Sequence, residues 1–452
     1  MKKVFAVAVV LCAALLGSYY LVGSRVEPLV TDYFAKAAAE NPTLAITPKS
    51  AEKGLFSSRY VYTLDMAVPS DRPAGGKPMR IVLDAAVDVA HGPVPFASGQ
   101  ASPAQAVVAT TFALNPASDQ DVKDFFAKFP ELMATKCFTR VAFGGDCETR
   151  LTVPGFSRTV AAGGQPLDVA WQGMTIDATH DSALTRVQSS AKAPLLLMKD
   201  GQASMAMRNM TLESKASLAT KLIWAGEHKL RIDAAEYKAA GQAQGGALAG
   251  LALDASLTPK GEVADYSLAL GGNLETGAGK AQPFRLRMQL SAIDLAALND
   301  LVALLQSKRA LAAGSPPLGE PELRAIGNAM LPRSPSAGLE FGFFEGEDAF
   351  SFSCEVRPEG MTAIPATAEQ ALPLLRAKAD LSGKLDVIVR TVCTVAASDK
   401  KAGVDQAQCA QELFAQAVQF VAMGLATVDG GRIASSAAWD GKVLTVNGRS
   451  LN

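Results

Sequence analysis

Strict alternation of apolar and polar residues is the feature of this 452-residue chain that most restricts its fold. Residues 284–290, for example, read FRLRMQL, and residues 80–90 read RIVLDAAVDVA. A period of two puts the apolar side chains on one face of a strand and the polar side chains on the other. Similar runs occupy residues 105–114, 167–179, 204–214 and 229–235. The pattern therefore predicts a long antiparallel sheet, flat or curved, with one buried and one wet face.

Helical spacing of apolar residues interrupts these strands at a few places. It predicts a helix at 119–135 with Ser118 as its N-cap, and further helices at 293–309, 366–378 and 405–425, the last with its phenylalanines facing inward. Residues 385–393 (LDVIVRTVC) are expected to form a strand. The Asp440-Gly441 pair between two alternating runs predicts a closing β-hairpin at 432–449. The expected fold class is α+β and β-rich, with helices interspersed among the strands.

Changes in composition divide the chain into four predicted parts. Residues 1–24 are expected to form a transmembrane signal anchor. Residues 25–48 are expected to form a juxtamembrane helix, which Asn41-Pro42 ends, followed by a linker. A β-rich region then covers residues 49–312. The Pro- and Gly-containing stretch GSPPLGEP at 314–321 introduces the fourth part, an α+β region at 313–452.

The predicted anchor, residues 4–23, reads VFAVAVVLCAALLGSYYLVG and holds no charge. About 20 apolar residues suffice to cross a bilayer as a helix. A cleaved signal peptide would have a shorter apolar region, and its one candidate cleavage point, near Gly17-Ser18, is followed by more apolar sequence. We therefore favour an uncleaved anchor over cleavage. Lys2 and Lys3 would keep the N-terminus in the cytoplasm, so the body is expected on the outer side of the membrane.

The spacing of the six cysteines agrees with an oxidising compartment. Cys137 and Cys147 flank a short segment with a Gly-Gly turn, and Cys393 and Cys409 flank a second short segment. We expect each pair to form a local disulfide, although the five cysteines outside the predicted anchor permit other pairings. Cys354 alternates with phenylalanines on one face of a strand and is expected to stay a buried thiol.

The sequence contains no recognisable catalytic or cofactor-binding motif. The three histidines, His91, His180 and His228, have no partner at metal-ligand spacing, so we expect no metal site. The glycine-rich stretch 271–280 lacks the first glycine of a phosphate-binding loop and is expected to be a hairpin loop. A net charge of −1 and the lack of basic runs argue against nucleic-acid binding. We therefore expect a protein that is not an enzyme and uses no cofactor.

Three short stretches resemble, in order and spacing, the bacterial YdgA-like family. They are Gly54-Leu55-Phe56-Ser57-Ser58 after the predicted anchor, Trp171-Gln172-Gly173-Met174 in mid-chain, and Asn447-Gly448-Arg449 in the last hairpin. Ala51 stands where that family commonly has an aromatic residue, Met174 replaces leucine and Arg449 replaces lysine. The resemblance implies a single-pass protein of the bacterial inner membrane with a periplasmic body, and it implies no reaction. We expect the motif residues Gly54, Leu55, Phe56, Ser57, Ser58, Trp171, Gly173, Asn447 and Gly448 to serve the fold.

Three functions are compatible with these features. We favour a non-enzymatic binding or scaffold protein of the cell envelope, whose β-rich body holds lipid or another hydrophobic ligand in an apolar groove. The alternative is an interaction module that organises envelope components through a protein partner or a homodimer. An envelope hydrolase is the third candidate, and it would need His180 or His228 beside a serine and a carboxylate.

Overall fold

The computed structural model describes residues 18–19, 28, 30–32, 34–35, 38, 43–68, 79–99, 103–162, 164–201, 203–238, 245–276, 281–310, 319–343, 350–389, 393 and 406–451. The predicted anchor at 4–23 therefore lies outside the described residues, apart from Ser18 and Tyr19. Within the described part of the chain, no helix is long and apolar enough to cross a membrane. The chain divides into two compact units, residues 1–218 with 302–317 and residues 219–301 with 318–452. The boundary expected at residue 313 falls among residues that are not described.

The first unit is built on an antiparallel sheet. Its strands are β1 (Leu44–Lys53), β2 (Ser57–Val68), β3 (Met79–His91), β4 (Ala106–Leu114), β5 (Lys136–Val141), β6 (Cys147–Val153), β7 (Phe156–Ala162), β8 (Gln165–Trp171), β9 (Met174–His180), β10 (Arg186–Asp200) and β11 (Ala203–Leu218). Neighbours in space follow the order β1–β2–β3–β4–β5–β6–β9–β10–β11. The β7–β8 hairpin joins the sheet through β8, which pairs with the second half of β10. The alternating sequence runs thus form the antiparallel sheet that they predict.

The core of this first sheet is densely covered. Tyr60, Tyr62, Val87 and Val89 are all at most 6% exposed and form one cluster. Val30 and Phe34, which belong to the predicted juxtamembrane segment, pack against it, and the Phe34 ring lies 4.3 Å from the Tyr62 ring. Of the predicted segment 25–48, Val30 and Phe34 thus lie on the sheet, and residues 44–48 belong to β1.

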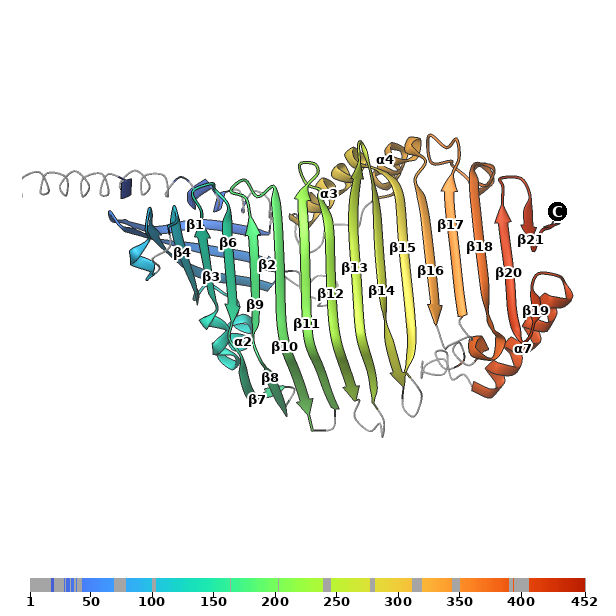
Figure 1. Ribbon diagram of the computed structural model, residues 1–452, viewed down its shortest axis with the longest axis horizontal. Coiled ribbons are helices and arrows are strands. Elements are labelled where there is room, and N and C mark those ends of the chain that lie inside the picture. The colour runs from blue at the N-terminus through green and yellow to red at the C-terminus, as the bar shows by residue number, and fades with distance from the viewer. Residues whose placement is uncertain are drawn as a thin grey trace, which may run out of the picture. The chain divides into compact units, whose positions relative to one another are not determined.

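The second unit is an antiparallel meander (Figure 1). Its strands are β12 (Trp224–Lys238), β13 (Gly246–Lys260), β14 (Val263–Thr276), β15 (Gln282–Asp294), β16 (Ser336–Phe343), β17 (Phe350–Pro358), β18 (Leu375–Lys384), β19 (Thr427–Asp429), β20 (Arg432–Trp439), β21 (Leu444–Val446) and β22 (Arg449–Leu451). From β12 to β18 each strand pairs with the next one in sequence, and β18 then pairs with β20. Successive antiparallel strands therefore extend one sheet without a crossover.

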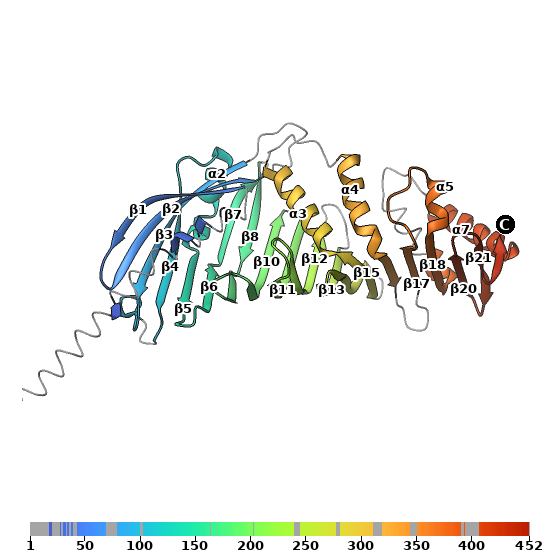
Figure 2. The ribbon, with the colours of Figure 1, turned by 90° about the horizontal axis from the view of Figure 1, so that it is seen from above.

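Helices pack beside these strands. In the first unit α2 (Gln120–Lys128) is followed by the 3₁₀ turn η2 (Pro130–Ala134), and η1 (Phe96–Ser98) follows β3. Farther along the chain lie α3 (Leu295–Ala310), α4 (Glu320–Met330), η3 (Leu331–Arg333), α5 (Ala368–Ala371), η5 (Leu372–Leu374) and α7 (Gln406–Ala422). Figure 2 shows α4 lying across the second sheet near β15, with which it makes contact.

Three sequence expectations are wrong in the second unit. Residues 366–378 form only the short α5, because Pro373 stops the helix and the alternating residues after it pair with β17 and β20 as β18. Residues 385–389 of the expected strand are helical. Gly271 and Gly272 lie inside β14 and not in a loop, and a Cβ on Gly272 would meet Leu251 and the Phe284 ring at 3.3 Å. Local glycine content thus indicates tight strand packing here, and not a turn.

The cysteines follow one of the two expected bridges. Cys393 and Cys409 form a disulfide with 5.7 Å between their Cα atoms, at the start of α7. Cys137 and Cys147 are separate thiols, because the β5–β6 register places Cys137 opposite Leu151 and Cys147 opposite Val141. Burial raises the pKa of both thiols, so both stay protonated. Cys354 is a free, half-buried thiol on β17.

Candidate functional site

The second sheet carries a continuous row of large apolar side chains. Strand register places Leu230 opposite Leu253, Leu253 opposite Leu270, and so on through one residue of each strand from β12 to β18. The complete row is Leu230, Leu253, Leu270, Leu286, Phe341, Phe352 and Leu381. Because paired residues in a sheet point to the same side, these seven side chains lie on one face. With strands about 4.8 Å apart, the row is roughly 29 Å long.

Parallel rows widen this surface, which we call the apolar face. Leu268, Met288, Leu339 and Cys354 form the second row, and Tyr266 and Leu290 begin a third. Every one of these side chains, like the seven of the first row, is only half-buried. A sheet face that packs a protein core would instead bury such residues almost completely, as the first unit does. Contiguous apolar surface that the protein does not bury completely is a candidate binding surface.

The other face of the same sheet is polar. Its central row begins with Lys229 and Asp254 and continues through Arg287, Glu340, Asp380 and Ser436, with Ala269 and Ser353 between them. Arg287 Nη1 lies 3.9 Å from Glu340 Oε2, and Lys378 Nζ lies 3.0 Å from Asp380 Oδ2. The alternation in sequence therefore separates a solvated face from an apolar one along the sheet.

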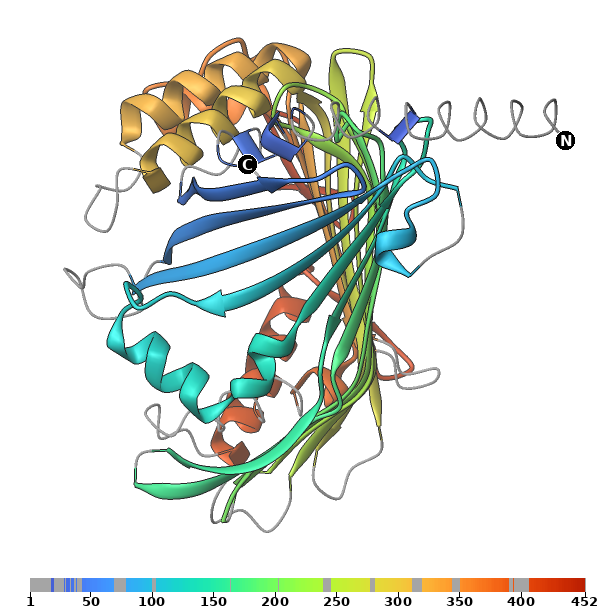
Figure 3. The same cartoon turned by 90° about the vertical axis from the view of Figure 1, so that its left-hand side faces the viewer.

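Helices cover only part of the apolar face. Figure 3 shows α4 and α7 on the same side of the second sheet, near opposite ends of the strands. Helix α7 packs through the small Ala417 in a cluster with Ile433 and Leu381. Its Phe414 and Phe420 were expected to face inward, but they are 41% and 46% exposed, and Val421 is 36% exposed. The buried position among the described residues of this helix is the small Ala417.

A second apolar surface lies in the first unit, between α2 and the β7–β8–β10 strands. This aromatic groove has a volume of about 570 Å3 and is lined by Phe125, Phe129, Leu132, Phe156, Val160, Leu167, Val169 and Met198, with Asp121, Asp124 and Lys128 from α2. The Phe129 ring lies 5.2 Å from both the Phe125 and the Phe156 rings. Phe125 is 48% exposed. A groove of this size and lining suits a small apolar group.

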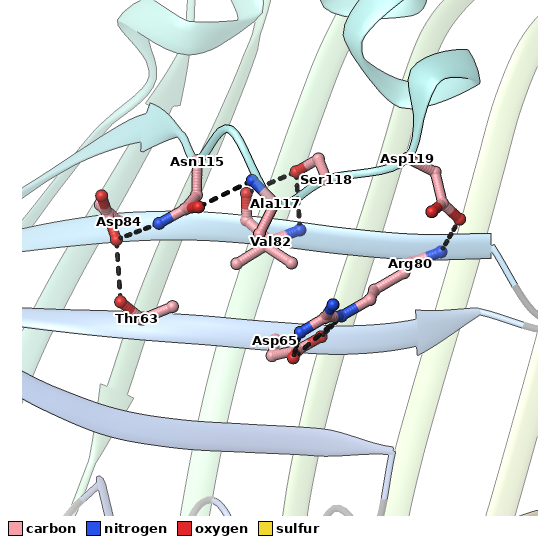
Figure 4. Close-up of polar contacts among 9 residues, drawn as sticks. All are labelled: Thr63, Asp65, Arg80, Val82, Asp84, Asn115, Ala117, Ser118 and Asp119. Carbon is pink, nitrogen blue, oxygen red and sulfur yellow. Dashed lines mark hydrogen bonds and ion pairs between the residues drawn. The ribbon is translucent and has the colours of Figure 1, made fainter.

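The loop between β4 and α2 is held against β3 by side chains that form hydrogen bonds with the backbone of β3 (Figure 4). Ser118 Oγ donates to the Val82 carbonyl at 2.7 Å and accepts from the Val82 amide at 2.9 Å. Asp119 Oδ2 accepts from the Arg80 amide at 2.7 Å. Ser118 is therefore not the expected N-cap: it is 4% exposed and serves the sheet, and the helix begins after Asp119. Pro130 ends the regular helix and starts η2.

Two carboxylates strengthen this junction. The Arg80 guanidinium, whose Nε lies 2.9 Å from Asp65 Oδ1, lowers the pKa of the Asp65 carboxyl. The Lys49 ammonium, 2.9 Å from Asp84 Oδ2, lowers the pKa of Asp84, with further hydrogen bonds to this carboxylate from the Asn115 amide and the Thr63 hydroxyl. Both groups are therefore ionised at neutral pH and fix the strands beneath α2.

The Gly54–Ser58 motif forms the β1–β2 turn. The Gly54 amide donates to the Ser57 carbonyl at 2.8 Å, and a Cβ on Gly54 would lie 2.9 Å from the same oxygen. Leu55 and Phe56 are 40% and 46% exposed at this turn. The His91 amide donates to the Phe56 carbonyl at 2.8 Å, which ties the turn to the end of β3.

Ser58 and His91 form a buried pair that the sequence does not reveal. Ser58 Oγ lies 3.0 Å from His91 Nε2, and His91 Nδ1 lies 3.1 Å from the Leu55 carbonyl oxygen. A carbonyl can only accept, so Nδ1 donates to it and Nε2 accepts from the Ser58 hydroxyl. A serine beside an oriented imidazole can be activated as a nucleophile. Here both side chains are enclosed, at 6% and 1% exposed, and we assign the pair to bracing the turn.

The other motif residues also lie where the chain bends. At the Trp171-Gln172-Gly173 stretch the β8–β9 chain kinks beside Gly155, which lies between β6 and β7. Gly173 has φ of +90°, and a Cβ there would lie 2.8 Å from the Val153 oxygen. A Cβ on Gly155 would lie 2.8 Å from the Trp171 oxygen. Two facing glycines thus let the two kinked chains approach each other.

Asn447 and Gly448 form the turn between β21 and β22, both with positive φ. The Asn447 amide donates to the Ser436 carbonyl at 2.8 Å, and its side-chain oxygen accepts from the Ser436 amide at 2.9 Å. Asn447 Nδ2 also donates to the Gly424 carbonyl at 3.2 Å. The motif therefore connects the closing strands to the end of α7.

The remaining two histidines belong to different units. His180 ends β9 in the first unit, with Nδ1 2.9 Å from the Asp181 carbonyl oxygen, and His228 lies on β12 in the second. Among the described residues, no cluster of histidine, cysteine, aspartate and glutamate could hold a metal ion.

The apolar face could be predicted only in part from the sequence. The alternating pattern shows which side of each strand is apolar. Only the register between strands shows that the apolar residues of separate strands form rows.

Comparisons with known proteins place the chain in a family. A family model described as "Bacterial protein of unknown function (DUF945)" matches residues 1–452. No curated protein and no solved structure matches the chain. Because the match runs from the first of these residues to the last, the chain belongs to this bacterial family of unknown function.

Proposed function

We propose that this protein binds the acyl chains of phospholipids on the apolar face of its second unit and is not an enzyme. The observation that carries the proposal is the row from Leu230 to Leu381, whose seven side chains share one face and stay half-buried. No charged residue interrupts this row. An apolar ligand that covers such a surface gains roughly 25 cal/mol for each Å2 removed from water.

The length of the row favours an acyl chain over a compact ligand. The row measures roughly 29 Å, whereas one leaflet of a bilayer has about half of the roughly 30 Å hydrocarbon thickness. An extended acyl chain therefore fits along the row with all of its carbons on apolar side chains. At one end of the row, Leu381 packs in a cluster with Ala417 of α7.

We also propose that residues 4–23 anchor the protein in the bacterial inner membrane, with the body in the periplasm. The charge-free apolar run after Lys2 and Lys3 supports this location, as does the resemblance to YdgA-like proteins. The Cys393–Cys409 disulfide agrees with an oxidising compartment. An anchored protein with an exposed apolar face has phospholipid within reach.

Site-specific photo-crosslinking in cells tests the lipid proposal. Photoreactive benzoylphenylalanine is placed at Phe341 on the apolar face or, as the matched control, at the neighbouring Glu340 on the polar face, in the full chain. Cells are grown with radioactive phosphate and irradiated, and the purified protein is assayed for covalently bound label. We expect label at position 341 in severalfold excess over position 340. Equal labelling at the two positions would contradict the proposal.

A second pair of variants tests whether the surface itself is needed. Leu270→Glu places a charge in the apolar row, and Ala269→Glu places the same charge on the polar face of the same strand. With the photoreactive group at Phe341, Leu270→Glu should lower the phosphate label about tenfold, which corresponds to about 1.4 kcal/mol of binding free energy. Ala269→Glu should leave it unchanged.

A second candidate function, an interaction module, is favoured by α7. Phe414, Val418 and Val421 follow helical spacing and are 41%, 67% and 36% exposed, so one stripe of the helix is apolar and uncovered. Photoreactive groups at Val418 and, as a control, at the exposed Gln416 distinguish this function. A protein adduct of one defined mass at Val418 alone would support it, and its absence from both positions would exclude α7 as a protein-binding helix.

A further inference from the structure

Three loops of the first unit lie at one edge of its sheet. Register brings them together: Ser57 at the β1–β2 turn pairs with Ala90, the next residue, His91, pairs with Ala106, and Ala106 pairs with Val141. The turn at 54–56, the segment 92–99 and the β5–β6 turn at 142–146 therefore share this edge. The backbone confirms their proximity, since the Ala104 amide donates to the Pro93 carbonyl and the Gln105 amide donates to the Val141 carbonyl.

These loops expose apolar side chains and almost no charge. Phe96 is 65% exposed, Phe143 59% and Leu55 40%. The stretches that carry them read GLFSS at 54–58, GPVPFASG at 92–99 and AFGGD at 142–146, and Asp146 is their one charged residue, in a chain of which 19% is charged. Surface loops of a soluble domain are usually polar, so the edge has the composition of a surface that avoids water.

Tyr19 fixes the position of this edge relative to the apolar run at 4–23. The Tyr19 side chain is 1% exposed, its hydroxyl donates to the Val94 carbonyl, and its ring meets the Phe56 ring edge-on at 5.0 Å. Tyr19 lies four residues before Gly23, the end of the run. Helical residues rise about 1.5 Å each, so in an anchor Tyr19 would lie about 6 Å from the end of the span. Its contacts place Phe56 and Val94 at that same depth.

We propose that Leu55, Phe96 and Phe143 enter the outer interface of the bilayer, so that the first unit rests directly on the membrane through this edge. The inference rests on the proposed anchor and commits to the lipid bilayer as the occupant. Aromatic side chains are favoured at the boundary between headgroups and acyl chains, and loops with little charge lose little when they leave water. The Ser58–His91 pair and the Phe56 carbonyl contact then acquire a purpose, because they hold the turn that receives Tyr19.

Quenching of tryptophan fluorescence by lipid tests the inference. The full chain is reconstituted in vesicles of phosphatidylcholine with bromine atoms on the acyl chains, and in vesicles of the unbrominated lipid. Tryptophan is added as Phe96→Trp, as Phe143→Trp or, for control, as Phe125→Trp, which is 48% exposed beside the other end of β4. The parental chain, with Trp171, Trp224 and Trp439, supplies the signal to subtract.

We expect the added signals at 96 and 143 to be quenched severalfold more than the signal at 125. Extraction of the parental membranes with alkaline carbonate separates this inference from the anchor. If the chain resists extraction and the signals at 96 and 125 are quenched equally, the proposed contact of this edge with the bilayer is wrong and the anchor is supported. If carbonate releases the chain, both the anchor and the proposed contact are wrong. Contact of Phe96 with a second copy or another protein would leave its signal independent of bromine and would also overturn the inference.

Discussion

The strands of the two units of this protein have the same alternating sequence pattern, yet their apolar faces are buried to different extents. In the first sheet Tyr60, Val87 and Val89 are at most 3% exposed. In the second unit Leu270 and Phe341, which lie on the apolar face, are only half-buried. Both are antiparallel, so strand direction does not account for the difference. What differs is the covering: part of the N-terminal segment packs on the first sheet, whereas helices cover only parts of the second.

An amphipathic strand pattern is therefore not enough to distinguish a core from a binding surface. A face that the protein covers with its own side chains contributes to its stability. A face left open contributes less to stability and keeps its apolar area for another molecule. The two faces should therefore respond very differently to the same substitution, and changes elsewhere should affect one unit at a time.

The largest expected effect comes from a charge placed in each face. Val87→Glu buries an unpaired carboxylate in the first core and should cost about 4 kcal/mol or more of unfolding free energy. Leu270→Glu in the apolar face should cost less than about 1.5 kcal/mol, because that side chain already meets water. Hydrogen exchange resolved by peptide measures both, unit by unit. Equal losses would remove the distinction between core and open face.

Loss of the disulfide should act on the second unit alone. Cys409→Ser frees a loop closed across a sequence separation of 16 residues, and the chain-entropy relation gives about 3 kcal/mol for such a loop. We expect faster proteolysis around α7 and unchanged exchange in the first unit. Cys354→Ser, which removes a free thiol, is the control. A transition that moved both units together would show that they unfold as one.

Ser58→Ala should destabilise the first unit. The change leaves His91 Nε2 buried without its partner, and an unsatisfied buried group costs about 1–3 kcal/mol. The neighbouring, exposed Ser57→Ala should cost less than about 0.5 kcal/mol. Urea denaturation followed by exchange at the β1–β2 turn measures the loss. No difference between the two serines would mean that the pair does not brace the turn.

The smallest effect is a pH dependence at the junction beneath α2. Because the pKa of Asp84 is lowered in the folded protein, its contribution to stability is present above the ordinary value of 3.8 and is lost as the pH falls through the lowered pKa. Asp84 is 20% exposed and Lys49 56%, so we expect at most about 1 kcal/mol. Asp84→Asn should therefore lower the urea midpoint of the first unit near neutral pH and lower it less at acidic pH, below the ordinary value of 3.8. An equal effect at both pH values would refute this assignment.

Sequence alternation predicts much of the fold because each strand has one wet face. The runs at 80–90 and 284–290 lie within β3 and β15 as expected. Local patterns fail where a distant partner decides the structure. Residues 375–378 have helical spacing but form β18 between two strands, and the glycines at 271–272 lie in a strand because Phe284 packs against them. In both cases tertiary packing outweighs local propensity.

The candidate site was only partly predictable, for a similar reason. The sequence predicted an apolar groove in a β-rich body. The row from Leu230 to Leu381, however, depends on the register of seven strands, and the sequence of a single strand does not contain that register. The Ser58–His91 pair joins residues 33 positions apart through a turn that carries no obvious signal for it. The Cys137–Cys147 bridge fails for the same reason, because a register of adjacent strands separates two cysteines that are close in sequence.

The meander of the second unit makes the length of its open face an adjustable quantity. Between β12 and β18 each strand pairs with its neighbours in sequence, so inserting or deleting one hairpin changes no other pairing. Each hairpin adds two strands, about 9.6 Å of apolar row, without changing which side chains face inward. Such a sheet can be lengthened or shortened in evolution one hairpin at a time.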